Sequence, residues 1–427
     1  MNSNTLSIGE NLKSIRQFFN LKQSDIAGED ITRNLISLIE NDKTPLHEKT
    51  ARLISDNINA HMEQRHSLAR TSIQDIMVPG IFNAKIEADR LIVYLKDNGN
   101  DIHFNLDAYL KKLNGFYASW DLPDKKYQNY FMLGTYFENL NKLDRSYLYY
   151  SLAYENAIRL DNKDSLGHIA SALTTMSLLL NNIDSVIILS DVIKPYGDSI
   201  KQDDMVLTLI NEALGYYFMN NYERSIDALL QAEHYISGPQ SHFYIETQIL
   251  KTHLYMKKKM MGIASRILKN LNHNKHNLPL DHHLLIDSCN LLLQCLLNNK
   301  ITDTQEYDRI KSQLNLIDED SKFYVGTLNH LGQVALLMNV TEEYYHITEQ
   351  VLTLCQKNNY KILFTYFFHQ VFETFRADQK MSFQFIRNIC LNYLNSDLLS
   401  PESGIHKQLL KICIENHDYD LINKLLH

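Results

Sequence analysis

The chain has 427 residues and a formal net charge of −8. Its 14 glycines and 7 prolines are too few for a sheet protein with many turns. No apolar run approaches the roughly 20 residues of a membrane helix, and the first ten residues are too polar for a signal peptide. Composition therefore predicts an all-α, cytoplasmic protein without a membrane partner.

The first predicted elements lie in residues 8–44. Helical spacing of Leu12, Ile15, Phe18 and Phe19 predicts a first helix with one buried face. A second, shorter helix opens at residues 22–24. Gly28 can then close a tight turn at positive φ, and Thr32 is a good N-cap for a third helix. Two short helices, a turn and a polar third helix are the layout of a helix-turn-helix DNA-binding domain.

The third helix has one apolar and one polar side. Leu35, Ile36 and Ile39 are predicted to face the core, and Arg16 and Glu40 are spaced to pair across the bundle. The polar side is where a recognition helix carries base-reading side chains. The candidate DNA-binding residues are Arg33, Asn34 and Ser37 for the bases, with Gln23, Thr32, Asn41 and Lys43 beside them for the backbone.

A family resemblance follows from these motifs. They read Leu12-Lys13-x-Ile15-Arg16, Leu21-x-Gln23-x-x-Ile26-Ala27 and Ile36-Ser37-x-Ile39-Glu40-Asn41-x-Lys43-x-Pro45. The pattern resembles the phage-repressor-like (XRE/Cro-C1) helix-turn-helix, in the short-turn version of the RRNPP peptide-pheromone receptors. Two departures are Asp42, where glycine is usual, and a neutral balance of nine Lys/Arg and nine Asp/Glu in residues 1–70. The alternative is a small helical bundle that only dimerises or docks a protein.

Residues 65–100 are expected to connect this domain, residues 1–64, to the rest. They contain a predicted polar helix over residues 65–77, then Val78-Pro79-Gly80, then a second helix over residues 81–95. We expect the connection to let the two parts change orientation, or to exchange between protomers of a homodimer.

Residues 101–427 show internal repetition. Leu133-Gly134-x-x-Phe137 and Leu214-Gly215-x-x-Phe218 each precede a run of small and large residues, and Leu331-Gly332 recurs later. Asn-Asn pairs recur at residues 181–182, 220–221, 298–299 and 358–359. The order resembles the tetratricopeptide repeat, which implies a right-handed superhelix of about eight or nine helix pairs. A non-repeating helical bundle is the alternative.

In such a superhelix the first helix of each pair lines the concave face. Counting from each Leu-Gly step places a set of amides and other side chains there. In the RRNPP receptors concave asparagines are understood to clamp the backbone of a short peptide, so the resemblance implies the same for Asn290 and Asn329 first. The candidate peptide-binding residues are Asn211 (a weaker candidate, one step off the line), Glu212, Tyr216, Met219, Asn290, Gln294, Asn329 and Gln333. Thr135 and Glu138 come from the earliest clear repeat.

Enzymatic, metal and cofactor chemistry is not expected. His273, His276, His282 and His283 cluster in sequence, but their spacing fits no regular zinc pattern. No nucleophile stands in a glycine-rich elbow, and no phosphate-cradling loop is present. The five cysteines, Cys289, Cys295, Cys355, Cys390 and Cys413, lie in apolar helical stretches without a Cys-x-x-Cys and read as reduced core thiols.

The leading functional hypothesis is a cytoplasmic transcription regulator. It would bind double-stranded promoter DNA as a homodimer under control of a short quorum-sensing peptide, and an RstA-like clostridial regulator of sporulation is a possible relative. The alternative is a tetratricopeptide scaffold that sequesters a response regulator or another signalling partner.

Overall fold

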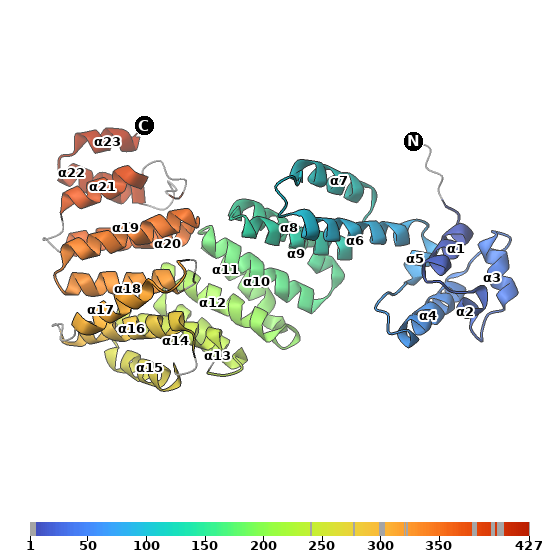
Figure 1. Ribbon diagram of the computed structural model, residues 1–427, viewed down its shortest axis with the longest axis horizontal. Coiled ribbons are helices and arrows are strands. Elements are labelled where there is room, and N and C mark those ends of the chain that lie inside the picture. Colours follow the sequence, from blue (N-terminus) through green and yellow to red (C-terminus); the bar gives the residue numbers. More distant parts are fainter. Residues whose placement is uncertain are drawn as a thin grey trace. The chain divides into compact units, whose positions relative to one another are not determined.

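The computed structural model describes residues 6–239, 241–275, 278–298, 304–319, 321, 323–377, 382–393, 398 and 405–426 (Figure 1). Within these residues every regular element is a helix and there is no strand. The chain divides into two compact units, Met1–Met132 and Leu133–His427. The expected fold class, a helix-turn-helix bundle followed by an array of tetratricopeptide-like helix pairs, is confirmed.

The first unit begins with a four-helix bundle: α1 (Ile8–Phe18), α2 (Gln23–Ala27), α3 (Arg33–Glu40) and α4 (Glu48–Gln64). Ser7 and Glu10 form a capping box at the start of α1, and the Thr32 side chain accepts from the Leu35 backbone N–H at the start of α3. Leu12, Ile15 and Ile36 are among the fully buried core residues. Phe18, expected inside, is 56% exposed and lies at the rim of this core, where its ring packs edge-on against Phe82.

The segment after α4 packs on this bundle. The predicted helix over residues 65–77 is wrong for its first part: α4 stops where His66 takes a positive φ, and α5 (Ile73–Met77) starts only after the Ser72 cap. Buried Asn11 of α1 donates to the backbone oxygens of Asp75 (2.8 Å) and Ile76 (2.9 Å). These bonds fix α5 against the bundle.

Two longer helices complete the first unit before α8. They are α6 (Ile81–Asn98), as predicted, and α7 (Leu106–Ser119). Phe82 of α6 belongs to the same apolar core as the helix-turn-helix. Much of the expected connection, residues 65–100, therefore packs together with the first domain.

The remaining helices are arranged as consecutive pairs in the second unit, with α8 crossing the division between the units. Their bounds are α8 (Pro123–Asn139), α9 (Leu143–Leu160), α10 (Lys163–Leu179), α11 (Ile183–Ile193), the 3-10 helix η1 (Lys194–Ser199), α12 (Gln202–Phe218), α13 (Tyr222–Tyr235), α14 (His242–Lys257), α15 (Met261–Asn274), α16 (Leu280–Asn298), α17 (Thr304–Leu314), α18 (Tyr324–Leu337), α19 (Thr341–Lys357), α20 (Lys361–Ala377), α21 (Phe383–Tyr393), α22 (Ile405–Glu415) and α23 (Tyr419–Leu426).

The Asn-Asn pairs explain how the chain turns between paired helices. Asn181 and Asn220 each adopt a positive φ just past a helix end, a conformation that asparagine tolerates better than most residues. The following Asn182 and Asn221 side chains cap the next helix by accepting from the Ser185 and Arg224 backbone N–H. One dipeptide thus ends a helix and starts its partner.

Small residues set the spacing inside a pair. A Cβ built on Gly134 would lie 2.3 Å from the Tyr150 ring, so glycine is required for α8 and α9 to approach. Ser146 in α9 donates to the Gly134 carbonyl (2.9 Å), and Ser225 in α13 repeats this bond with the Ala213 carbonyl of α12 (2.7 Å). The repeated contact supports the assignment of both pairs to one repeat type.

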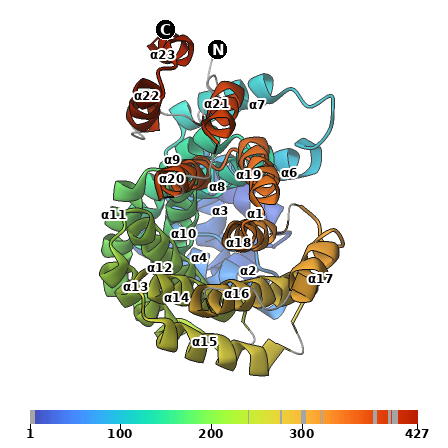
Figure 2. The same cartoon turned by 90° about the vertical axis from the view of Figure 1, so that its left-hand side faces the viewer.

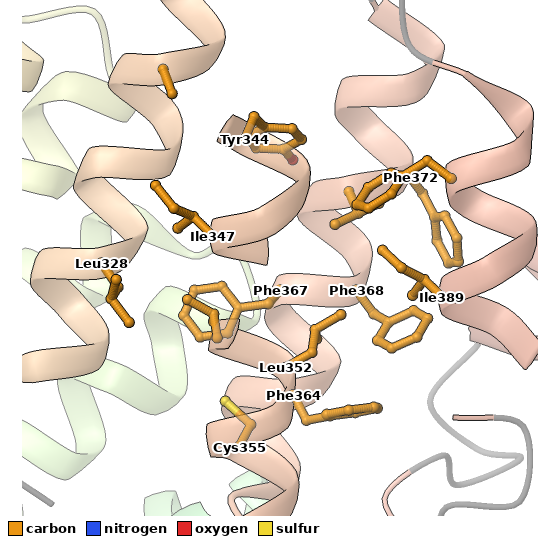
Figure 3. Close-up of a cluster of buried hydrophobic side chains, with 14 of the residues drawn as sticks. Leu328, Tyr344, Ile347, Leu352, Cys355, Phe364, Phe367, Phe368, Phe372 and Ile389 are labelled. Carbon is orange, nitrogen blue, oxygen red and sulfur yellow. The ribbon is translucent and has the colours of Figure 1, made fainter. Parts of the chain in front are cut away.

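The second unit curls until distant helices touch. Figure 2 shows α20 beside α10, and Ile362 of α20 packs with Leu178 and Val186 in one buried cluster. A larger apolar core follows along α16 to α23, where Phe364, Phe368 and Phe372 of α20 lie among neighbouring aliphatic side chains (Figure 3). The phenylalanines recur every four residues, which keeps them on one side of α20.

Candidate functional site

The polar face of α3 is open to solvent. Arg33 and Asn34 are exposed and Ser37 is half-buried, while Ile36 and Ile39 on the opposite side are in the core. Thr32 and Lys43 are also exposed at the two ends of this face. Exposed guanidinium and amide groups on a helix held by its apolar side can enter a major groove.

A buried ion pair fixes the orientation of α3. Arg16 of α1 contacts the Glu40 carboxylate at two points, Nε–Oε1 2.5 Å and Nη2–Oε2 2.9 Å, as the sequence predicted. This bidentate hydrogen bond raises the pKa of Arg16. Gln23 also donates to Glu40 (2.9 Å), so its amide is engaged inside the bundle in this structure. This third partner was not predicted from the sequence.

Asp42 explains the departure from the usual glycine. It takes the left-handed conformation after α3, with φ 56°, and its carboxylate accepts from the Gly9 backbone N–H (3.1 Å) and from the Ser7 hydroxyl. An acidic group at the start of α1 is favourable because the helix N-terminus is electropositive. Asn41 donates to the Ser37 carbonyl (2.6 Å), so its side chain closes α3 in this structure.

The second unit has a largely apolar cavity of about 360 Å³ between α10, α12 and the helices from α18 to α20. Its lining on α12 is a single helical stripe made of Leu207, Ile210, Asn211, Leu214 and Phe218. Glu246 and Glu319 add two carboxylates. The cavity thus combines an apolar floor with two amides, Asn211 and Asn358, and negative charge.

Asn211, the weaker sequence candidate on α12, is the one that lines this cavity. Its Nδ2 donates to the hydroxyls of Thr174 (3.1 Å) and Thr175 (2.9 Å) in α10. The side chain is buried and held in one place. The α12 side chains that line the cavity are therefore shifted by one residue from the positions predicted by counting from the Leu-Gly step.

The other α12 candidates lie away from the cavity. Glu212 is buried against α11 and η1, where it accepts from Ser190 (2.6 Å) and pairs with Lys194 (2.7 Å). Tyr216 is buried under the Arg224 guanidinium. Met219 is 51% exposed at the C-cap of α12. Their contacts assign Glu212 and Tyr216 to packing between helices.

The later amides are more scattered. Asn329 lines a small crevice of about 20 Å³ with residues of α19 and α20. Asn290 and Gln333 are half-buried, and Gln294 is exposed. Of the earliest pair, Thr135 and Glu138 both hydrogen-bond the Tyr150 hydroxyl, at 3.1 and 2.6 Å.

A second, more polar cavity of about 320 Å³ lies where α20 meets α12. Tyr217 and Tyr366 line it and hydrogen-bond through their hydroxyls at 2.9 Å. Phe218 and Ile362 line both cavities. The contact between α12 and α20, which closes the curled unit, therefore lies between the two cavities.

The histidines that cluster in sequence are not the ones that gather in space. His282 pairs with Asp281 (2.7 Å) and packs against Phe323, and His276 lies outside the described residues. Three other side chains meet instead: His253, Cys289 and His330. They come from three helices, so sequence spacing carried no signal for them. All five cysteines are free and buried.

Comparison with solved structures shows a likeness in fold. No family model matches the chain, and no curated protein matches it. Over 66% of this chain and 98% of the other, it is similar to Bacillus thuringiensis PlcR, solved in complex with the peptide PapR7 and DNA, at 15% identity and a TM-score of 0.34.

Among the described residues, none of the helices combines the length and the apolar character needed to cross a membrane.

Proposed function

We propose that this chain is a non-enzymatic transcription regulator that binds double-stranded promoter DNA through α3. The observation that carries the proposal is the exposed Arg33 and Asn34 face on a helix whose other side is locked by the core and by Arg16–Glu40. Such a helix presents hydrogen-bonding groups to base edges with little freedom to lose on binding.

A homodimer is part of this proposal. One helix-turn-helix contacts too few base pairs to select a promoter, so two copies on a two-fold related site are expected. Light scattering of the full chain with a bound DNA fragment tests this. A single copy per fragment at micromolar concentration would refute it.

The proposed control ligand is a short peptide in the cavity beside Asn211. The apolar lining suits aliphatic or aromatic side chains, and Glu246 and Glu319 suit a peptide with a basic end. Both hydrogens of the Asn211 amide are donated to Thr174 and Thr175, which leaves its Oδ1 to accept from a peptide backbone N–H. Asn290 and Asn329 remain candidates for the same role further along the array. A cytoplasmic quorum-sensing receptor of the RRNPP type, RstA-like or not, is the finer form of this proposal.

Peptide binding would act by shifting the curvature of the second unit. The cavity is bounded on one side by α10 and α12 and on the other by α18 to α20, so an occupant bears on the contact between α20 and α10. A ligand shifts the equilibrium between two curvatures only as far as its affinities for the two differ. A substantial shift requires a difference of a few kcal/mol.

The test of the DNA proposal is selection of bound fragments from a random double-stranded library with the full chain. We expect a two-fold related motif, and Arg33→Ala should weaken binding to it by about 1–3 kcal/mol. Arg90→Ala removes the same charge from an exposed site on α6 and is the matched control. Absence of an enriched motif would overturn the proposal.

The second candidate function is a scaffold that sequesters a response regulator or another signalling partner. The balanced charge of residues 1–70 favours it, because phosphate contacts supply most nonspecific DNA affinity. A salt titration separates the two. A regulator loses DNA affinity steeply as salt rises, whereas a scaffold shows no DNA binding to lose.

A further inference from the structure

Three potential metal ligands meet in the interior of the second unit. His253 lies in α14, Cys289 in α16 and His330 in α18, the first helices of three consecutive pairs. The two histidine Nε2 atoms are 2.7 Å apart, and the Cys289 Sγ is 3.7 Å from the Nε2 of His253. All three ligand atoms lie within 4.8 Å of one another.

The hydrogen bonds around His330 define its tautomer. The Ser288 hydroxyl lies 3.0 Å from the Leu285 carbonyl, to which it donates, and 2.8 Å from the His330 Nδ1. Having given its proton to Leu285, Ser288 accepts from His330, so Nδ1 carries the hydrogen and Nε2 a lone pair. Metal-binding histidines are held in the same way, by a partner on the ring nitrogen that does not bind the metal.

Both rings are neutral, which is the charge state that binds a metal. Burial lowers the pKa of His253 to about 4, helped by the charge of Lys257. Burial also lowers the pKa of His330 well below its ordinary value, with a smaller contribution from His253. Neutral imidazole is the ligand for zinc, and the rings need not lose a charge to bind it.

We propose that His253, Cys289 and His330 form a binding site for one Zn²⁺ ion. Zinc–nitrogen bonds of about 2.0–2.1 Å and a zinc–sulfur bond of about 2.3 Å put tetrahedral nitrogens roughly 3.3 Å apart. The two Nε2 atoms must therefore separate slightly, while the Cys289 Sγ already lies at a suitable distance from His253. His253 is half-buried, and Cys289 and His330 are fully buried. A water or another exogenous group completes the fourth position.

The proton balance of this step is simple. Burial raises the pKa of the Cys289 thiol to about 12, so the thiol is protonated before the metal arrives. As the zinc–sulfur bond forms, the thiol proton leaves to buffer. Because the His330 Nε2 has a lone pair, the His253 Nε2 carries the proton of the hydrogen bond between the two rings. When zinc binds, that proton leaves Nε2 and another is taken up on Nδ1, so the number of protons on the His253 ring does not change. One proton is released per zinc bound, and affinity should rise with pH.

Zinc binding would join α14, α16 and α18 in one place. Each of these helices belongs to a different pair, so the ion would hold three successive pairs at a fixed spacing. A ligand that binds the folded chain and not the unfolded chain also raises stability by mass action.

The experiment uses the full chain after treatment with a chelator and dialysis. Zinc is titrated in competition with a chromophoric chelator, and cobalt is titrated separately as a spectroscopic probe. We expect one ion per chain, a thiolate-to-cobalt charge-transfer band, and one proton released. No stoichiometric binding by the wild-type chain, or cobalt bound without a thiolate band, would overturn the proposal.

Variants locate the site. Cys289→Ser and His253→Gln should each weaken zinc binding at least ten-fold and remove or alter the cobalt band. Cys355→Ser changes another fully buried cysteine, in α19, and should leave both unchanged. Circular dichroism checks that the variants are folded, and His253→Gln decides if Cys289→Ser does not fold. Wild-type affinity in the folded variant would refute the assignment.

Discussion

The Tyr217 hydroxyl in α12 lies 2.9 Å from the Tyr366 hydroxyl in α20, although 149 residues separate the two in sequence. Burial raises the pKa of both tyrosines, so both hydroxyls are neutral and one donates to the other. The pair lies beside Phe218 at the contact that closes the second unit. It ties the early repeats to the late ones.

The first prediction concerns this pair. Tyr366→Phe should lower the free energy of unfolding by about 1–3 kcal/mol, because the buried Tyr217 hydroxyl loses its partner. Tyr217→Phe combined with Tyr366→Phe should cost less than the sum of the single changes, since no buried hydroxyl is then stranded. Urea unfolding measures all three. Strictly additive costs would show that the hydroxyls do not interact.

The second prediction concerns the pair that holds α3. Glu40→Ala should destabilise the first unit by about 3–5 kcal/mol, because it leaves the Arg16 guanidinium partly buried without its carboxylate. Replacing both residues with apolar ones, Arg16→Met with Glu40→Leu, should cost less than Glu40→Ala alone. Thermal unfolding of the full chain measures the change in stability. Amide hydrogen exchange in residues 1–132 then assigns that change to the first unit. A smaller effect for the single change than for the double would contradict it.

The sequence predicted features carried by local patterns. The capped start of α3, the positive φ at Gly28 and the Arg16–Glu40 pair all follow from residues within a few turns of one another or from a known spacing. The register of α12 was missed by one residue. In α12 the Leu-Gly step faces α11, with Gly215 nearest to Ile183, whereas Asn211 faces α10.

Long-range closure was beyond sequence reasoning. Whether α20 returns to α10 depends on small rotations summed over several helix pairs, and no single residue encodes that sum. The meeting of His253, Cys289 and His330 has the same origin, because each comes from a different pair. The prediction for Phe18 was wrong for another reason. Its spacing fits the buried face of α1, but the side chain lies at the rim of the core, where its contact is Phe82 of α6.

The third prediction separates base contacts from phosphate contacts. Asn34→Ala should reduce discrimination between the selected site and its single-base variants, with a loss of about 1–3 kcal/mol on the best site. Lys43→Ala should weaken binding to all sequences alike and reduce the salt dependence by about one charge. Fluorescence anisotropy at several salt concentrations measures both. Equal losses on selected and random DNA for Asn34→Ala would remove it from base recognition.

The last prediction tests the proposed peptide clamp. Asn211→Ala should weaken binding of a short peptide with apolar side chains and a basic end by about 1–3 kcal/mol, because a peptide group buried in the cavity loses its partner. The fold should survive. The Thr174 and Thr175 hydroxyls that Asn211 contacts also donate to the Ser171 carbonyl, at 2.8 and 3.0 Å, so neither is stranded.

Gln294→Ala is the matched control, since this exposed amide lies on α16, outside the residues that line the cavity. Asn290→Ala and Asn329→Ala test whether the clamp extends along the array, and each should then weaken the same peptide. Calorimetry with a peptide selected from a synthetic library measures all four variants, with DNA binding as a check on the first unit. If Asn211→Ala bound that peptide as tightly as the wild type, the amide would have no role in the clamp. Binding that survived every change, Asn329→Ala included, would remove all three asparagines from the clamp.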